Sequence, residues 1–112
     1  MTSLLQGAAR LEVNANVLVA SGEAGFDMAA ALAEKGCGWL MQQPQGSEVV
    51  FDLSGVDQAS SAALSVMLEW LRCAHRRQLS VVEVRLSAPL SRLTAMAGLE
   101  QLLPEVHAET SL

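Results

Sequence analysis

Two adjacent serines, Ser60 and Ser61, are the residues of this sequence best placed to take part in chemistry. They follow a strand-like segment (48–53) and a polar turn (54–59), and they open a leucine-rich helical segment that runs to about residue 75. Ser60 is expected to cap this helix, because a serine hydroxyl accepts a hydrogen bond from a free amide of the first turn. Free amides and the helix dipole also favour phosphate there, so Ser61 is a candidate phosphorylation site, with plain capping as the alternative.

Signatures of an enzyme are sparse. The sequence contains no phosphate-binding lysine loop, dinucleotide fingerprint, HExxH zinc motif or GxSxG motif. Asp52 and Asp57 flank the turn, but such pairs are more often solvated or capping groups than an acid–base couple. A serine nucleophile needs a base within reach, and nothing places His75 or His107 beside the serines. We therefore expect no catalytic residue, no cofactor and no metal.

Composition predicts one domain over residues 1–112, with a core from about 8 to 104. The chain has 112 residues, of which 51% are apolar, and this suffices for a packed core. The net charge of −5 argues against a nucleic-acid partner, because phosphate binding needs concentrated lysine and arginine. The basic residues at 72–77 are expected to complement a helix C-terminus.

The cysteines and the hydrophobic runs predict a cytoplasmic protein. Cys37 and Cys73 form neither a CxxC motif nor a metal-binding spacing, so we expect two buried or half-buried thiols in a reducing compartment. The first residues lack the basic and apolar regions of a signal peptide. No apolar run approaches the roughly 20 residues of a membrane span, so no direct membrane insertion is expected.

The hydrophobic pattern predicts strands and helices in alternation. Expected strands cover 8–13, 17–20, 48–53 and 80–87, and the first two form a hairpin. Expected helices begin at Phe26, Ser60 and Pro89, and the two glycines at 36 and 38 are expected to end or bend the first helix. Residues 1–6 suggest a loose leader, 99–103 a further turn and 105–112 a frayed tail. This order favours a single sheet with parallel crossovers and helices mainly on one face.

The helix that begins at Ser60 carries more apolar surface than one sheet covers. Two apolar stripes follow helical spacing along it. The first contains Leu64, Met67, Leu68 and Leu71, and the second contains Ala63, Val66, Trp70 and Cys73. One stripe should pack on the sheet, and the other needs a partner inside or outside the chain; both alternatives stay open.

Several motifs together resemble the STAS family, the sulfate-transporter and anti-sigma-factor-antagonist domains, over roughly Ala8 to Pro104. They are the VFDLSGV segment at 50–56, Ser60 and Ser61 ahead of Leu64, the strand at 80–86 and the LEQLLP segment at 99–104. The resemblance implies a single mixed α/β sheet, with an initial β-hairpin and then parallel strands, and helices mainly on one face.

Within this family, anti-sigma-factor antagonists carry a hydroxyl residue that a partner kinase phosphorylates. Ser61 aligns with that residue, and Ser60 stands where those proteins have an aspartate. Ala62 and Ala63 replace their glycines. The resemblance therefore implies, as an alternative function, an anti-sigma-factor antagonist regulated by phosphorylation of Ser61.

The compact sequence with its leucine-rich second helix is most similar to the MlaB type of STAS domain. That type binds the ATPase subunit of a phospholipid ABC transporter, and indirectly its permease, and so supports outer-membrane lipid asymmetry. The resemblance implies a non-enzymatic cytoplasmic subunit that is peripheral to the inner membrane through the complex. The implied partner-binding residues are Ser60, Ser61, Leu64, Ser65 and Trp70.

Overall fold

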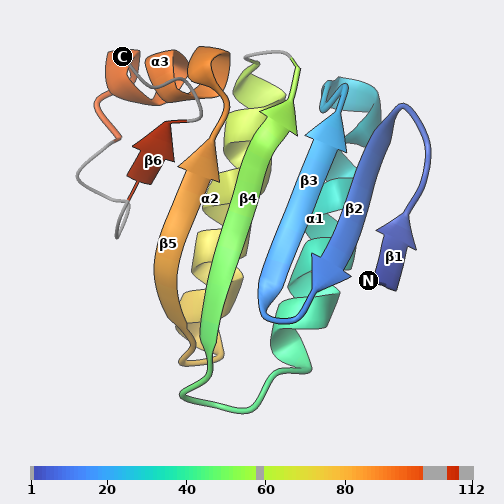
Figure 1. Cartoon of the computed structure of the whole chain (residues 1–112), viewed down its shortest axis with the longest axis vertical. Helices are drawn as coiled ribbons and strands as arrows, with labels where there is room; N and C mark the ends of the chain where they lie inside the picture. Colours follow the sequence, from blue (N-terminus) through green and yellow to red (C-terminus); the bar gives the residue numbers. More distant parts are fainter. Residues whose placement is uncertain (1, 58–59, 100–105, 109–112) are drawn as a thin grey trace.

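Six strands form one sheet in the computed structural model, which describes residues 2–57, 60–99 and 106–108. The elements are β1 (Thr2–Leu5), β2 (Ala9–Asn14), β3 (Val17–Gly22), α1 (Phe26–Met41), β4 (Glu48–Val56), α2 (Ser61–Arg76), β5 (Ser80–Leu86), α3 (Ala88–Met96) and β6 (Val106–Ala108). The strands lie side by side in sequence order (Figure 1). The first three are antiparallel, and β3 to β6 are parallel. The predicted mixed sheet with an initial hairpin is therefore confirmed.

Helices α1 and α2 cover one face of the sheet, and Figure 1 shows both behind the strands. Alternate residues of the central strands point into this layer, as period-two side chains require. Fully buried examples are Leu18 of β3, Phe51 of β4 and Val84 of β5. These three residues lie in register across the sheet, on the face against which the helices pack.

Among the described residues, no helix combines the length and apolar character needed to cross a membrane.

A buried tryptophan joins the two helices to the sheet. Trp70 of α2 is 0% exposed, and its indole Nε1 donates a hydrogen bond to the carbonyl oxygen of Leu32 in α1, at 3.1 Å. Its ring meets Phe51 edge-on, with centroids 5.5 Å apart. The indole occupies the space that a side chain at Gly36 would fill, since a Cβ built there collides with it. Trp70 thus fixes the distance between α1, α2 and β4.

This packing explains why the expected break in α1 is wrong. The helix continues without interruption from Phe26 to Met41, through Gly36 and Gly38. A glycine in a helix interior costs roughly 1 kcal/mol relative to alanine. At position 36 this cost is offset because the indole packs directly against the helix backbone. Only glycine leaves room for that contact.

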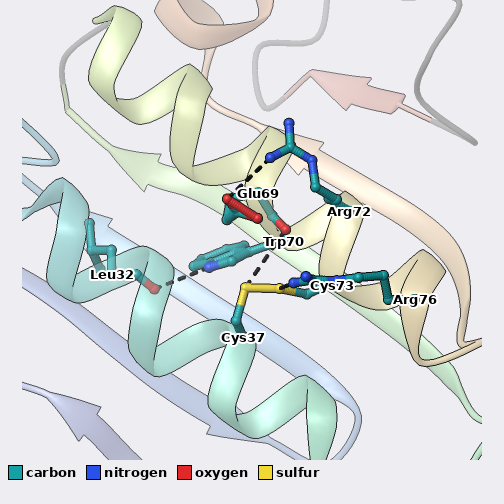
Figure 2. Close-up of a disulfide and its surroundings, with 7 residues drawn as sticks. All are labelled: Leu32, Cys37, Glu69, Trp70, Arg72, Cys73 and Arg76. Atoms are coloured by element: carbon teal, nitrogen blue, oxygen red, sulfur yellow. Dashed lines mark hydrogen bonds and ion pairs between the residues drawn. A yellow bond between two sulfur atoms is a disulfide. The ribbon is translucent and has the colours of Figure 1, made fainter.

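The expectation of two free thiols is also wrong, because Cys37 and Cys73 form a disulfide. The cysteines lie on facing turns of α1 and α2, with Cα atoms 5.7 Å apart, and the cross-link joins positions 36 residues apart in sequence (Figure 2). Cys37 follows Gly36 directly, and Cys73 lies one helical turn after Trp70. The packing of the indole against Gly36 therefore also brings the two sulfur atoms together.

The two ends of the chain are more ordered than the sequence pattern predicts. Residues 2–5 are not a loose leader, because β1 pairs with β2 and extends the sheet at that edge. Part of the expected frayed tail forms β6, which pairs in parallel with β5. Most of the turn expected at 99–103 lies outside the described residues.

The close approach at Gly36 yields a matched pair of substitutions in one helix. Gly36→Ala should lower the free energy of unfolding by about 1–3 kcal/mol, because the new methyl group overpacks the indole. Gly38→Ala should raise it by about 0.5–1 kcal/mol, because a Cβ there meets nothing within 4 Å and alanine favours helix. Urea unfolding measures both values. Equal changes in the free energy of unfolding for the two variants would contradict the close packing of Trp70 against Gly36.

Candidate partner-binding surface at the start of helix α2

The start of α2 lies at the edge of the sheet where the parallel strands β3 and β4 end. The loops that follow these strands are joined there, since the Asp57 amide donates to the carbonyl oxygen of Gly22, at 3.0 Å. Helices α1 and α2 therefore both begin at this edge (Figure 1). In open α/β sheets the carboxyl edge of parallel strands is the usual place for functional loops and helix N-termini.

Ser60 fixes the first turn of α2. Its backbone is extended, and its hydroxyl oxygen accepts a hydrogen bond from the Ala63 amide at 3.1 Å. The same hydroxyl donates to the carbonyl oxygen of Ala24, 3.2 Å away in the loop before α1. The predicted cap is therefore confirmed, and it also ties α2 to the neighbouring loop. Ser60 is half-buried, so its main contacts are within the chain.

The next residues present a face that carries no charge. Ser61, Leu64, Ser65 and Leu68 follow at spacings of three and four, so they lie on one side of the helix. We call these four residues the α2 N-terminal face. The serines are exposed and the leucines half-buried, and the Ser65 hydroxyl donates to the Ser61 carbonyl oxygen at 2.9 Å. No charged residue occurs between 61 and 68, as is typical of the centre of a protein interface.

The structure decides which stripe of α2 faces inward. Ala63, Val66, Trp70 and Cys73 are all buried, so the second stripe packs inside the chain. Trp70 was expected to contact a partner, and this expectation is wrong because its side chain is enclosed between Gly36, Leu32 and Phe51. The first stripe divides: Met67 is buried, whereas Leu64, Leu68 and Leu71 stay partly exposed.

An exposed aromatic residue at the same sheet edge was missed in the sequence reading. Phe26, the first residue of α1, is 78% exposed. The cap residue before it, Gly25, has no side chain that could cover the ring.

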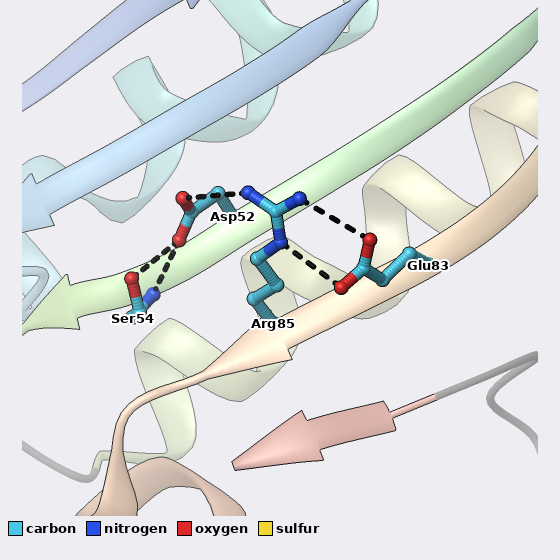
Figure 3. A network of polar contacts seen from close by, with 4 residues as sticks. All are labelled: Asp52, Ser54, Glu83 and Arg85. Carbon is cyan, nitrogen blue, oxygen red and sulfur yellow. Dashed lines mark hydrogen bonds and ion pairs between the residues drawn. The ribbon is translucent and has the colours of Figure 1, made fainter. Parts of the chain in front are cut away.

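Of the two aspartates near the turn, Asp52 belongs to a network of polar side chains and Asp57 is exposed. On the sheet face opposite the helices, Asp52 accepts hydrogen bonds from the Ser54 amide and hydroxyl, at 3.0 and 2.6 Å, and pairs with Arg85 at 3.6 Å (Figure 3). Arg85 also donates to both Glu83 carboxylate oxygens. These hydrogen bonds to Glu83, together with the nearby charge of Asp52, raise the pKa of Arg85. Asp57 is exposed and directly follows the last residue of β4.

One group in the described part of the chain brings together three atoms that could ligate a metal. The sulfur atoms of Cys37 and Cys73 and a carboxylate oxygen of Glu69 lie within 4.8 Å of one another (Figure 2). The cysteines are joined in a disulfide, whereas a metal needs thiolates. In addition, Arg76 places a guanidinium nitrogen 3.2 Å from the Cys73 sulfur, and this positive charge opposes cation binding.

Comparison with known proteins identifies the domain. A family model described as "MlaB, STAS domain" matches residues 8–104. No curated protein matches the chain.

The two serines at the start of α2 should respond differently to removal of the hydroxyl. Ser60→Ala should lower the free energy of unfolding by about 1–2 kcal/mol, because it removes the cap on Ala63 and the link to Ala24. Ser61→Ala should change it by less than about 0.5 kcal/mol, because that side chain is exposed. Urea denaturation of both variants tests this division. A larger loss of unfolding free energy in the Ser61 variant than in the Ser60 variant would show that Ser61, and not Ser60, caps the helix.

Proposed function

The chain belongs to the STAS domain family, in its MlaB type, and on this premise we propose that it is a non-enzymatic subunit that binds the ATPase of a phospholipid ABC transporter. In this proposal the domain docks on the ATPase and supports its assembly and activity. The transporter would move phospholipid to maintain outer-membrane lipid asymmetry. The domain would then be cytoplasmic and peripheral to the inner membrane, held there by the ATPase and, through it, by the permease.

The observation that carries this proposal is the α2 N-terminal face. It offers two exposed hydroxyls and two half-buried leucines on a rigid helix. A protein partner can cover such a face without stripping water from a charge, which would be costly. Ser60 contributes by fixing the helix start. Trp70 contributes by holding α2 against α1 and the sheet, and so acts on the face without touching the partner.

Docking on one face of α2 suggests how a subunit without catalytic residues affects an ATPase. A partner that prefers one conformation of the ATPase shifts the population toward it, by as much as its affinities for the two conformations differ. A rigid surface suits this role, since little conformational entropy is lost on binding. The disulfide, the indole contact and the Ser60 cap all restrain α2 within the domain.

The alternative is an anti-sigma-factor antagonist controlled by phosphorylation, and the exposure of Ser61 favours it. Ser61 is the first residue of α2, and the first turn contains no acidic side chain that would repel phosphate. Against it, the expected glycines are Ala62 and Ala63, and both are buried in the helix. A kinase therefore meets a formed helix at this site rather than a glycine-rich turn.

A charge placed on the α2 N-terminal face should weaken binding to the ATPase. Ser61→Glu should raise the Kd at least about tenfold, because a carboxylate at the centre of an uncharged interface is buried without a partner. The fold should be retained, since an acidic residue in the first turn suits the helix dipole. Size-exclusion chromatography and biolayer interferometry with the purified ABC ATPase measure binding, and urea unfolding measures stability.

Ser80→Glu is the matched control. Ser80 is also exposed, but it begins β5 at the opposite edge of the sheet, so the same charge change should leave the Kd within about twofold. An equal loss of affinity with the Ser61 and Ser80 variants would indicate a general effect of the added charge. Full affinity of the Ser61 variant would remove the start of α2 from the interface. Binding of wild-type protein to a serine kinase but not to the ATPase would support the alternative function.

A further inference from the structure

The disulfide lines a hollow between α1 and α2. Small side chains of α1, Ala30 and Ala33, leave room on one side. The remaining lining residues are Glu34, Cys37, Glu69, Arg72, Cys73 and Arg76. Figure 2 shows the bridge between the two helices with the side chains of α2 around it. A molecule in solvent can therefore approach the bridge from the side of the half-buried Cys37 without the domain unfolding.

The two sulfur atoms differ in exposure and in charge environment. Cys37 is half-buried, whereas Cys73 is 2% exposed, so solvent reaches the residue on α1 more easily. Arg76 donates from Nη2 to the Cys73 sulfur at 3.2 Å. Arg72 lines the same hollow but pairs with Glu69, at 3.4 Å. A positive charge therefore lies against one sulfur of the bridge, and it would stabilise negative charge on that atom.

From this asymmetry we propose that Cys37–Cys73 is a thiol–disulfide exchange site for small thiols such as glutathione. An external thiolate attacks the sulfur of Cys37, and the sulfur of Cys73 leaves as a thiolate beside Arg76. Exchange is faster when the leaving thiolate is better stabilised, and the guanidinium supplies that stabilisation. This site is separate from the α2 N-terminal face, and the proposal does not depend on the identity of the partner.

The chemistry balances in two steps. In the first, glutathione thiolate forms a bond to the Cys37 sulfur, the disulfide breaks, and the electron pair goes to Cys73. In the second, another glutathione thiolate attacks the glutathione sulfur of this mixed disulfide and releases Cys37 as a thiolate. Two glutathione molecules become oxidised glutathione, and the protein gains two electrons. Once the Cys37 thiolate takes up a proton from water, its S–H can donate to the Glu69 carbonyl oxygen, which lies 3.7 Å from the sulfur in the bridged form.

Opening the bridge would release a tether between α1 and α2 while the indole contact of Trp70 is kept. In a reducing compartment, disulfides of this kind are usually transient and respond to oxidants. Oxidised glutathione would close the bridge by the reverse of the two steps. The pair would therefore make the stiffness of the helix layer depend on the thiol–disulfide balance around it.

The first test locates the attacked sulfur. The oxidised full-length protein is incubated with reduced glutathione under native conditions, quenched with acid and alkylated, and its peptides are mapped by mass spectrometry. We expect a glutathione adduct on Cys37 that precedes the fully reduced form. An adduct mainly on Cys73, or a bridge that is reduced only in denaturant, would overturn the proposal. So would a protein that retains two free thiols after equilibration with oxidised glutathione.

The second test removes the proposed charge. Arg76→Met should slow reduction by glutathione roughly threefold to tenfold, because the leaving thiolate loses its neighbouring cation. Arg76→Lys should restore most of the rate. Arg72→Met is the matched control on the same helix and should change the rate by less than about twofold. Equal rates for the two methionine variants would overturn the role of Arg76, and urea unfolding of each shows that rates are compared in folded protein.

Discussion

The arrangement of the two helices depends on the packing of the Trp70 indole against α1 and β4. The ring contacts two other elements at once. It meets Phe51 of β4 edge-on, and on α1 it donates a hydrogen bond to the Leu32 carbonyl oxygen and packs against Gly36. An aromatic residue of this size contributes a large part of the apolar area that a small core buries. Its N–H finds a partner within the core, so burial leaves that donor satisfied. One side chain thereby sets the spacing and register of α1 against α2.

Two consequences follow for the surface. Because the inner stripe of α2 is committed to this packing, the side with Ser61, Leu64, Ser65 and Leu68 faces outward as a defined and uncharged face. The same register places Cys37 opposite Cys73, and so forms a bridge between the two helices. The proposed docking surface and the proposed exchange site thus share an origin in one buried contact, although they involve different residues.

Local patterns predicted the features that depend on neighbouring residues. Short apolar runs, together with alternation in the first strand, predicted the hairpin and the central strands. Ser60 was recognisable as a cap because capping involves only the next turn. Features that depend on contacts between distant segments were not predictable in this way. The break expected at Gly36 was wrong because the residue that needs the glycine lies on another helix. For the same reason the two apolar stripes of α2 could not be told apart, Trp70 was placed at an interface, and the cysteines were taken for separate thiols.

Site-specific photo-crosslinking can show whether the start of α2 binds an ABC ATPase. A benzophenone amino acid would replace exposed Ser65 on the α2 N-terminal face or, as a control, exposed His75 at the other end of the helix. After irradiation in native cells, mass spectrometry would identify the proteins joined to each position. We expect the ATPase of a phospholipid ABC transporter at position 65 and little or none at 75. A crosslink to the ATPase from 75 alone, or to a kinase from 65, would contradict this expectation.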